Sequence, residues 1–327
     1  MLAILYLVTM VALGDFLCRH AYRFRSVPHR LATAFIVGLV VSTWFTYLVS
    51  LLFGEKPRPL IYGDLAYFAV SWALLFRFRG IEPLLPAPRP PGSGRLDGAF
   101  VAAFFIFASW LMFSTLGFHQ GMIEVAAKVV SDFGPNLSIA QSFALGHNFP
   151  TEYPHYPGVP IHYHFLYYFQ VGNLSFLGLP LPYSLNVLSI FSLTSMCILV
   201  MTLGEILFDS RAVGRLGASL FFFNSSLAYV PFLRSHGPSV GTAWNAVTRL
   251  NLFLDSGYPF RGDSWGPWQM NVFDNQRHLA SGISLLLIVL VFLFDRYREL
   301  LPQVEEAEAT PADEEENAQL LAEEPGL

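Results

Sequence analysis

The stretch YSLNVLSIFSLTSMCILVMTLGEIL, residues 183–207, decides the class of fold. A helix needs roughly 20 mostly apolar residues to cross a hydrocarbon core of about 30 Å, and this stretch is longer than that. Glu205, close to its end, is its only charged residue. The stretch therefore predicts a transmembrane helix.

Six other stretches along the chain have the same apolar character, so the sequence predicts an all-α integral membrane protein with about seven transmembrane helices. The six are residues 2–18, 31–53, 60–76, 98–117, 216–233 and 279–294. Composition agrees, because 54% of the residues are hydrophobic and only 13% are charged. A soluble domain carries roughly 25% charged residues, so soluble enzyme classes are excluded. Two cysteines also exclude a disulfide scaffold.

Basic residues give the expected orientation in the membrane. Lys and Arg gather in the cytoplasmic loops of membrane proteins. If the N-terminus lies outside, four clusters fall on the inner side, which favours a multi-pass protein of the plasma membrane. The clusters are Arg19, Arg23, Arg25 and Arg30; Arg77, Arg79, Arg89 and Arg95; Arg211 and Arg215; and Arg296 and Arg298.

The chain divides into three parts. Residues 1–97 hold the first three predicted helices and a basic inner linker. Residues 98–300 form a membrane core with two exterior loops, 118–182 and 234–278. Residues 301–327 contain nine acidic residues and neither Lys nor Arg. Such a composition is typical of disorder and predicts a cytoplasmic acidic tail.

The first exterior loop contains two predicted interfacial helices. Residues 137–145 place their apolar side chains mostly on one face at helical spacing, and Gly146 follows at the position where helices often end. The second helix begins near Ile161. Residues 160–178 are aromatic but carry several polar residues, which suits a helix that lies in the membrane interface rather than one that crosses.

Several motifs of this loop occur together. Asp132 follows a predicted transmembrane helix, an Asn-Phe-Pro turn begins at Asn148, and a Tyr- and His-rich run covers residues 161–168. Together they resemble the first outer loop of the GT-C membrane glycosyltransferases. The resemblance is closest to the bacterial and archaeal membrane proteins with a Tyr-rich "YYY" segment and more distant to protein O-mannosyltransferases. It covers about residues 98–294.

The resemblance implies a function and a set of residues. Such enzymes transfer a sugar from a polyprenyl-phosphate donor at the outer face, so the implied partners are a lipid-linked sugar donor and membrane lipids. Asp132 matches the loop acid and is the expected general base, since a carboxylate within about 3 Å of a sugar hydroxyl activates it. Arg277, in an Asn-Gln-Arg-His run, is expected to bind the lipid phosphate. The other expected substrate-binding residues are His155, His162, Tyr163, His164 and His278.

Each assignment has a structural alternative. Asp132 could be the N-cap of the helix that follows it, and Arg277 could anchor its helix at the interface. Tyr167, Tyr168 and His164 could form an interfacial aromatic belt. A divalent metal held by Asp132 and one histidine is a further alternative, and no other cofactor is implied.

The enzymes that the chain resembles usually carry more helices. A second hypothesis is therefore a non-catalytic membrane subunit or scaffold with a truncated GT-C core, which a second polypeptide would complete. A transporter is less favoured, because the polar residues concentrate in the exterior loops and not along the helices. The basic clusters are explained by topology, so no nucleic acid is expected as a partner.

Overall fold

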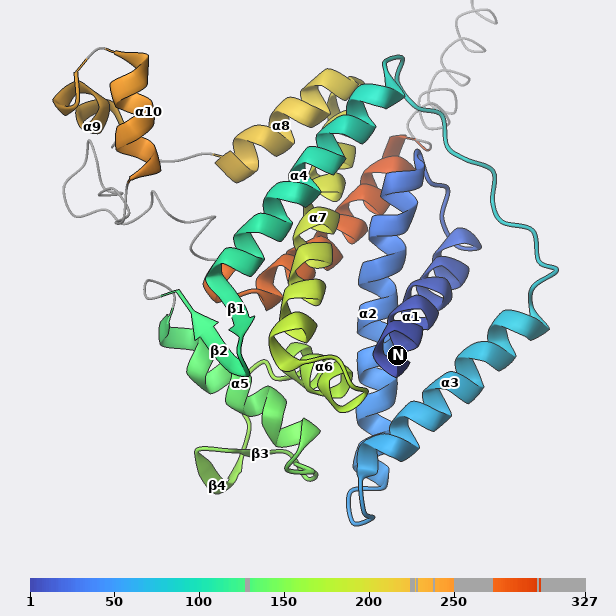
Figure 1. Cartoon of the computed structure of the whole chain (residues 1–327). Helices are drawn as coiled ribbons and strands as arrows, with labels where there is room; N and C mark the ends of the chain where they lie inside the picture. Colours follow the sequence, from blue (N-terminus) through green and yellow to red (C-terminus); the bar gives the residue numbers. More distant parts are fainter. Residues whose placement is uncertain are drawn as a thin grey trace, which may run out of the picture.

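In a computed structural model, the described part of the chain comprises residues 1–126, 130–223, 227, 229–237, 239–249, 273–298 and 300. Within it, six helices are long and apolar enough to cross a membrane. The expectation of a multi-pass helical membrane protein is confirmed (Figure 1). The six are α1 (Leu2–Arg19), α2 (Val27–Leu52), α3 (Pro59–Arg77), α4 (Gly94–Thr115), α7 (Leu181–Phe208) and a last, unlabelled helix, His278–Arg298.

Local sequence explains where two of these helices begin. The Ser26 hydroxyl accepts a hydrogen bond from the His29 backbone N–H at 3.2 Å, and a proline occupies the first turn of α2. The Ser93 hydroxyl accepts one from the Leu96 N–H at 3.4 Å at the start of α4. Serine is a preferred N-cap residue, and proline is tolerated in the first turn. Both helices therefore begin earlier than their apolar stretches predict.

Glycines bring α1 and α2 together with their backbones in contact. A Cβ atom on Gly14 would lie 2.0 Å from the Ala34 carbonyl oxygen, and one on Gly38 would lie 2.1 Å from that of Met10. Small residues at such crossings allow the close approach that stabilises helix pairs in membranes.

At one end of the bundle, called here the basic end, α4 begins and α7 and the last helix finish (Figure 1). The predicted basic residues Arg95, Arg211, Arg296 and Arg298 belong to these helix ends or to the helix that follows α7. The Arg89 guanidinium bridges two buried carboxylates, Glu205 at 2.6 Å and Asp97 at 2.9 Å. Arg211 and Arg215 also pair with Asp97. These ion pairs join the linker after α3 to α4, α7 and the chain that follows α7.

The predicted span 216–233 is wrong. Its first part belongs to α8 (Arg211–Phe223) and its end to α9 (Tyr229–Ser235), while residues 224–226 and 228 lie outside the described part. α8 has 13 residues, which at 1.5 Å per residue reach about 20 Å, less than a hydrocarbon core. Close packing holds it beside α7, since a Cβ atom on Gly214 would lie 2.5 Å from the Met201 carbonyl oxygen.

Two predicted regions lie outside the described residues. The acidic tail is one, and the stretch 250–272 of the second exterior loop is the other. Before that stretch lies α10 (Val240–Thr248).

The first exterior loop contains two hairpins that the all-α expectation missed. β1 (Leu116–His119) pairs with β2 (Met122–Val125), and β3 (Glu152–Tyr153) pairs with β4 (Tyr156–Pro160). The β1–β2 turn has positive φ at Gln120 (50°) and Gly121 (81°). Two such residues form the tight turn that suits the twist of paired strands.

The loop also contains the two expected helices, α5 (Val130–Ala144) and α6 (Leu166–Phe176). As predicted, α6 does not qualify as a span. Tyr167 to Leu174 are all buried, so the rest of the protein encloses this helix. Buried partners explain this: the Asn173 amide donates to Asp64 of α3 at 3.0 Å, and Gln170 accepts from Thr43 of α2 at 3.3 Å. Both Asp64 and Gln170 are therefore in the interior of the bundle.

Candidate functional site

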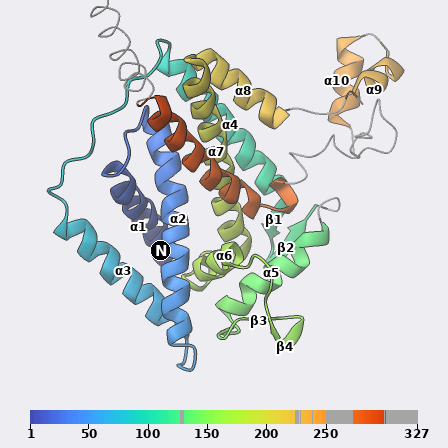
Figure 2. The same ribbon diagram turned by 180° about the vertical axis from the view of Figure 1, so that it is seen from behind.

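The residues just before the last helix form the centre of the candidate site. In both ribbon views the start of this helix lies beside β1 and close to α5 (Figures 1 and 2). We call this the loop end of the bundle, opposite the basic end. At the loop end, the residues just before the last helix lie against the first exterior loop.

Arg277 is fixed in the interior at the loop end, with 1% of its surface exposed. Its guanidinium donates to the Asn186 side-chain oxygen of α7 at 2.6 Å and to the Thr115 hydroxyl of α4 at 2.9 Å. It also pairs with Asp274 at 3.2 Å. Arg277 thus connects α4, α7 and its own segment.

Neighbouring groups complete this buried cluster. The Thr115 hydroxyl donates to Asp274 at 2.7 Å, and the Asn186 amide donates to the Leu116 carbonyl oxygen at 2.9 Å. Burial raises the pKa of Asp274, while the Arg277 cation and the Thr115 hydrogen bond oppose that rise. A buried ion pair of this kind needs its hydrogen bonds to offset the cost of desolvation.

Asp132 lies next to this cluster, in the first turn of α5 and partly buried. Its carboxylate accepts a hydrogen bond from the Gln276 amide. The following residue, Phe133, packs its ring 5.0 Å from the Arg277 guanidinium carbon. The structure therefore brings Asp132 to the same place as Arg277. The N-cap alternative for Asp132 is wrong, because α5 already begins at Val130.

An aromatic stack adjoins these residues. The rings of His164 and His278 lie 3.6 Å apart at 29°, and the Tyr163 ring lies 3.5 Å from that of His164. The Tyr168 hydroxyl is 3.3 Å from His278 Nδ1. Tyr167 and Tyr168 are 9% and 1% exposed, so they do not form an interfacial belt.

Burial changes the proton affinity of these groups. It raises the pKa of Tyr163 above 10.0, with a further contribution from the Asp132 carboxylate nearby. It lowers the pKa of His164 below 6.5, so that this imidazole is neutral at pH 7. It raises the pKa of Tyr167 to about 12. The site therefore combines one carboxylate with neutral hydrogen-bonding rings.

Two of the expected site residues are exposed and are not part of the aromatic stack. His155 is in the exposed turn between β3 and β4, and His162 is exposed in the segment before α6. Among the described residues, no hydrogen bond, ion pair or ring contact joins either of them to Asp132 or to the histidine stack. That part of the chain also contains no group of three His, Cys, Asp or Glu side chains able to hold a metal ion.

The sequence did not indicate several residues of the site. Gln276 stands in the Asn-Gln-Arg-His run, yet nothing in the run distinguishes it as the partner of Asp132. Thr115 and Asn186 lie inside apolar stretches. A polar residue in such a stretch is the one available signal, because a buried polar group requires a partner.

Comparison with protein-family models, with curated proteins and with solved structures finds no match to this chain. Its function therefore has to be argued from its own residues and geometry.

Proposed function

We propose that this protein is a membrane glycosyltransferase of the GT-C type, which transfers a sugar from a polyprenyl-phosphate donor at the outer face. The observation that carries the proposal is the position of Asp132, whose carboxylate is held by Gln276 beside the Tyr163–His164–His278 stack. A carboxylate in reach of a sugar hydroxyl can take its proton, and the neighbouring rings offer a surface on which a sugar can stack.

The proposed reaction assigns a role to each group. The acceptor oxygen forms a bond to the anomeric carbon, and its proton passes to the Asp132 carboxylate. The bond between the anomeric carbon and the phosphate oxygen breaks, and its electron pair leaves with the polyprenyl phosphate. The neutral ring of His164 has an N–H that can donate a hydrogen bond to the developing phosphate charge. Tyr163, 43% exposed, offers a ring on which a sugar can stack.

Arg277 has a different role in this proposal from the phosphate binding that the resemblance implies. Its guanidinium is enclosed, and the contacts described above are all with the chain itself. In this proposal Arg277 is a positioning residue, which holds the neighbouring Gln276 and His278 in place, and it does not contact the donor phosphate.

A second candidate function is a non-catalytic subunit or scaffold. The enclosure of Arg277 favours it, because no other arginine of the described residues contacts the Asp132 cluster to neutralise a leaving phosphate. In that case the bond between Gln276 and Asp132 would serve only to join the two exterior loops.

An in-membrane transfer assay with a radiolabelled polyprenyl-phosphate sugar tests the proposal. We compare the wild type with Asp132→Asn, which keeps an oxygen to accept the Gln276 hydrogen bond but removes the base. Loss of a general base typically costs 10²–10⁴-fold in rate. Glu124→Gln is the matched control, because Glu124 is an exposed acid of the same loop. Transfer by Asp132→Asn at the wild-type rate would refute the role of Asp132, and absence of transfer by every form would favour the scaffold.

A further inference from the structure

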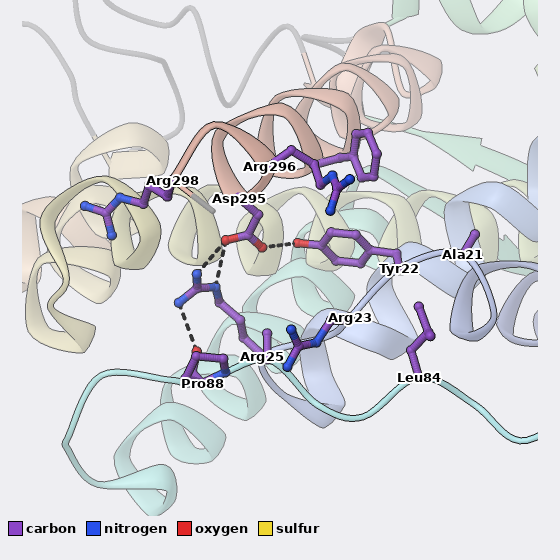
Figure 3. Close-up of a pocket in the computed structure, with 11 residues that line it drawn as sticks. Ala21, Tyr22, Arg23, Arg25, Leu84, Pro88, Asp295, Arg296 and Arg298 are labelled. Carbon is purple, nitrogen blue, oxygen red and sulfur yellow. Dashed lines mark hydrogen bonds and ion pairs between the residues drawn. The ribbon is translucent and has the colours of Figure 1, made fainter. Parts of the chain in front are cut away.

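Five acidic residues of the described part of the chain are buried, and four of them have an arginine as partner. The four are Asp97, Glu205, Asp274 and Asp295. Figure 3 shows one of these pairs at the basic end, where Arg25 and Tyr22 donate to the Asp295 carboxylate. The fifth is Asp64 of α3, and no Lys, Arg or His of the described part pairs with it. Buried charges in proteins are paired or bind metal ions, so Asp64 needs a counter-charge.

The surroundings of Asp64 leave two oxygen atoms without a partner. Asp64 is 4% exposed, and its Oδ1 accepts the hydrogen bond from the Asn173 amide at 3.0 Å. Its Oδ2 and the Oδ1 of Asn173, a fully buried residue, have no hydrogen-bond partner among the described residues. An ionised carboxylate and an amide oxygen only accept hydrogen bonds, so neither atom can satisfy the other. A positively charged group would satisfy both.

A third oxygen of this kind belongs to Ser50 of α2. Its hydroxyl is buried and has no partner within the described part of the chain. It lies against α3, because a Cβ atom on Gly63, the residue before Asp64, would be 2.2 Å from Ser50 Oγ. The helices α2, α3 and α6 therefore each contribute an unpartnered oxygen to the same buried region.

We propose that Asp64 binds one alkali cation, with Asn173 and Ser50 as further oxygen ligands. Hard cations prefer oxygen ligands, and the single charge of Asp64 balances a monovalent ion. A divalent ion would leave a net positive charge in the interior of the bundle. Ionisable residues inside membrane proteins often mark ion pathways. An alkali ion needs only one charged ligand, so the site is compatible with the lack of a three-ligand metal cluster in the described residues.

A proton is the competing occupant. It would neutralise the Asp64 carboxyl and allow it to donate to one acceptor, such as Asn173 Oδ1. A proton joins two oxygens, however, and the Ser50 hydroxyl would remain without a partner. A cation can contact all three oxygens at once. The observations therefore favour the cation, and occupation by a proton is an outcome of the test.

The proposed cation site lies near the loop end, where α2 finishes and α3 begins (Figure 1). Asp64 is in the second turn of α3, which at 1.5 Å per residue is about 8 Å from the start of this helix at Pro59. The expected orientation places this end outside, so the ion comes from the external solution. The inference does not depend on the proposed sugar transfer, because Asp132 and the ring stack take no part in it.

Equilibrium dialysis of the purified full chain against radioactive sodium tests the inference, in a neutral detergent with choline chloride to hold the ionic strength constant. Radioactive rubidium replaces sodium in a parallel series and reports a site that prefers the larger alkali ions. We expect the wild type to bind a single ion per chain. Asp64→Asn keeps the shape of the side chain but removes its charge, so it should abolish binding. Loss of an outer partner of a metal ligand already costs about 10–100-fold in affinity, so Asn173→Leu should weaken binding at least about 10-fold.

The unfolding temperature gives a second measurement, because a ligand that binds only the folded chain stabilises it. Replacement of choline by the alkali cation should raise the unfolding temperature of the wild type but not that of Asp64→Asn. Glu55→Gln is the matched control and should respond like the wild type, because Glu55 is an exposed acid in the turn before α3.

Two results would overturn the inference. One is equal binding of the cation by the wild type and by Asp64→Asn. The other is the absence of saturable binding of either ion by the wild type. In that case an infrared carbonyl band of a protonated carboxylic acid, lost in Asp64→Asn, would identify the proton as the occupant.

Discussion

The side-chain amide of Gln276 donates a hydrogen bond to the carboxylate of Asp132, 144 positions earlier in the chain. This bond joins the first turn of α5 to the residues that precede the last helix. The next residues of the two segments are also in contact, because the Arg277 guanidinium lies over the ring of Phe133. The two exterior loops therefore meet at a defined pair of neighbours, and the sugar-transfer proposal requires that meeting.

Removal of this hydrogen bond should reduce sugar transfer. In Gln276→Leu, Asp132 loses the group that orients its carboxylate, and a misplacement of about 1 Å can cost on the order of 100-fold in rate. The transfer assay measures the change. Asn245→Leu, which replaces an exposed amide of α10, is the control. If Gln276→Leu kept full activity, orientation by this bond would not matter for transfer.

Arg277→Leu should strongly destabilise the fold. It leaves the Asp274 carboxylate buried without its cation, and breaking a buried pair in this way costs about 3–5 kcal/mol. Thermal unfolding in detergent measures the loss. The double variant Asp274→Asn/Arg277→Leu should recover part of it, because no uncompensated charge then remains. A double variant less stable than Arg277→Leu alone would show that the ion pair is not the source of the effect.

Acid should destabilise the protein partly through His164. Burial lowers the pKa of this ring in the folded chain below its ordinary value of 6.5. As the pH falls from 6.5 toward the lowered pKa, the unfolded chain takes up a proton that folded His164 resists, so stability is lost. His164→Phe keeps the stack on His278 but cannot titrate. Its unfolding temperature should fall less than that of the wild type between pH 7.5 and 5.5.

The control for that comparison is His155→Phe, because His155 is exposed in the β3–β4 turn. Its acid sensitivity should equal that of the wild type. The same sensitivity in all three proteins would exclude His164 as a contributor.

Gly14→Ala should separate α1 from α2. The new methyl group would meet the Ala34 carbonyl oxygen at 2.0 Å, and overpacking of this kind costs about 1–3 kcal/mol or more. Gly98→Ala in α4 is the matched control, since a Cβ atom there has no neighbour within 4 Å. Alanine forms helices better than glycine, so this control should not lose stability. Equal unfolding temperatures for the two variants would contradict the close packing.

The apolar stretches predicted most of the membrane helices, because length and hydropathy are properties of a local run of residues. They failed at 216–233, where a continuous apolar pattern concealed a short helix. The packing of Gly214 on α7 and the pairing of Arg211 and Arg215 with Asp97 define α8, and both involve residues distant in sequence. The burial of α6 could not be predicted from the sequence either. It depends on hydrogen bonds to Asp64 and Thr43, which lie on other helices.

The site, like the fold, could be predicted from the sequence only in part. The sequence indicated Asp132, Tyr163, His164 and His278 through the resemblance, and the structure places all four at the loop end. It also indicated His155 and His162, which are exposed in the structure and are not part of the ring stack. The sequence did not indicate that the His164 ring stacks on the ring of His278, which is distant from it in the chain.

By itself, the sequence determined that this chain is a helical membrane protein, because burial in lipid depends on how many apolar residues follow one another. It also located the basic residues, from which the orientation of the helices in the membrane is predicted. Only the tertiary structure decided that Arg277 is enclosed and that Gln276 holds Asp132. Those relationships depend on which helices pack side by side, and packing is set by contacts between residues that no local pattern connects.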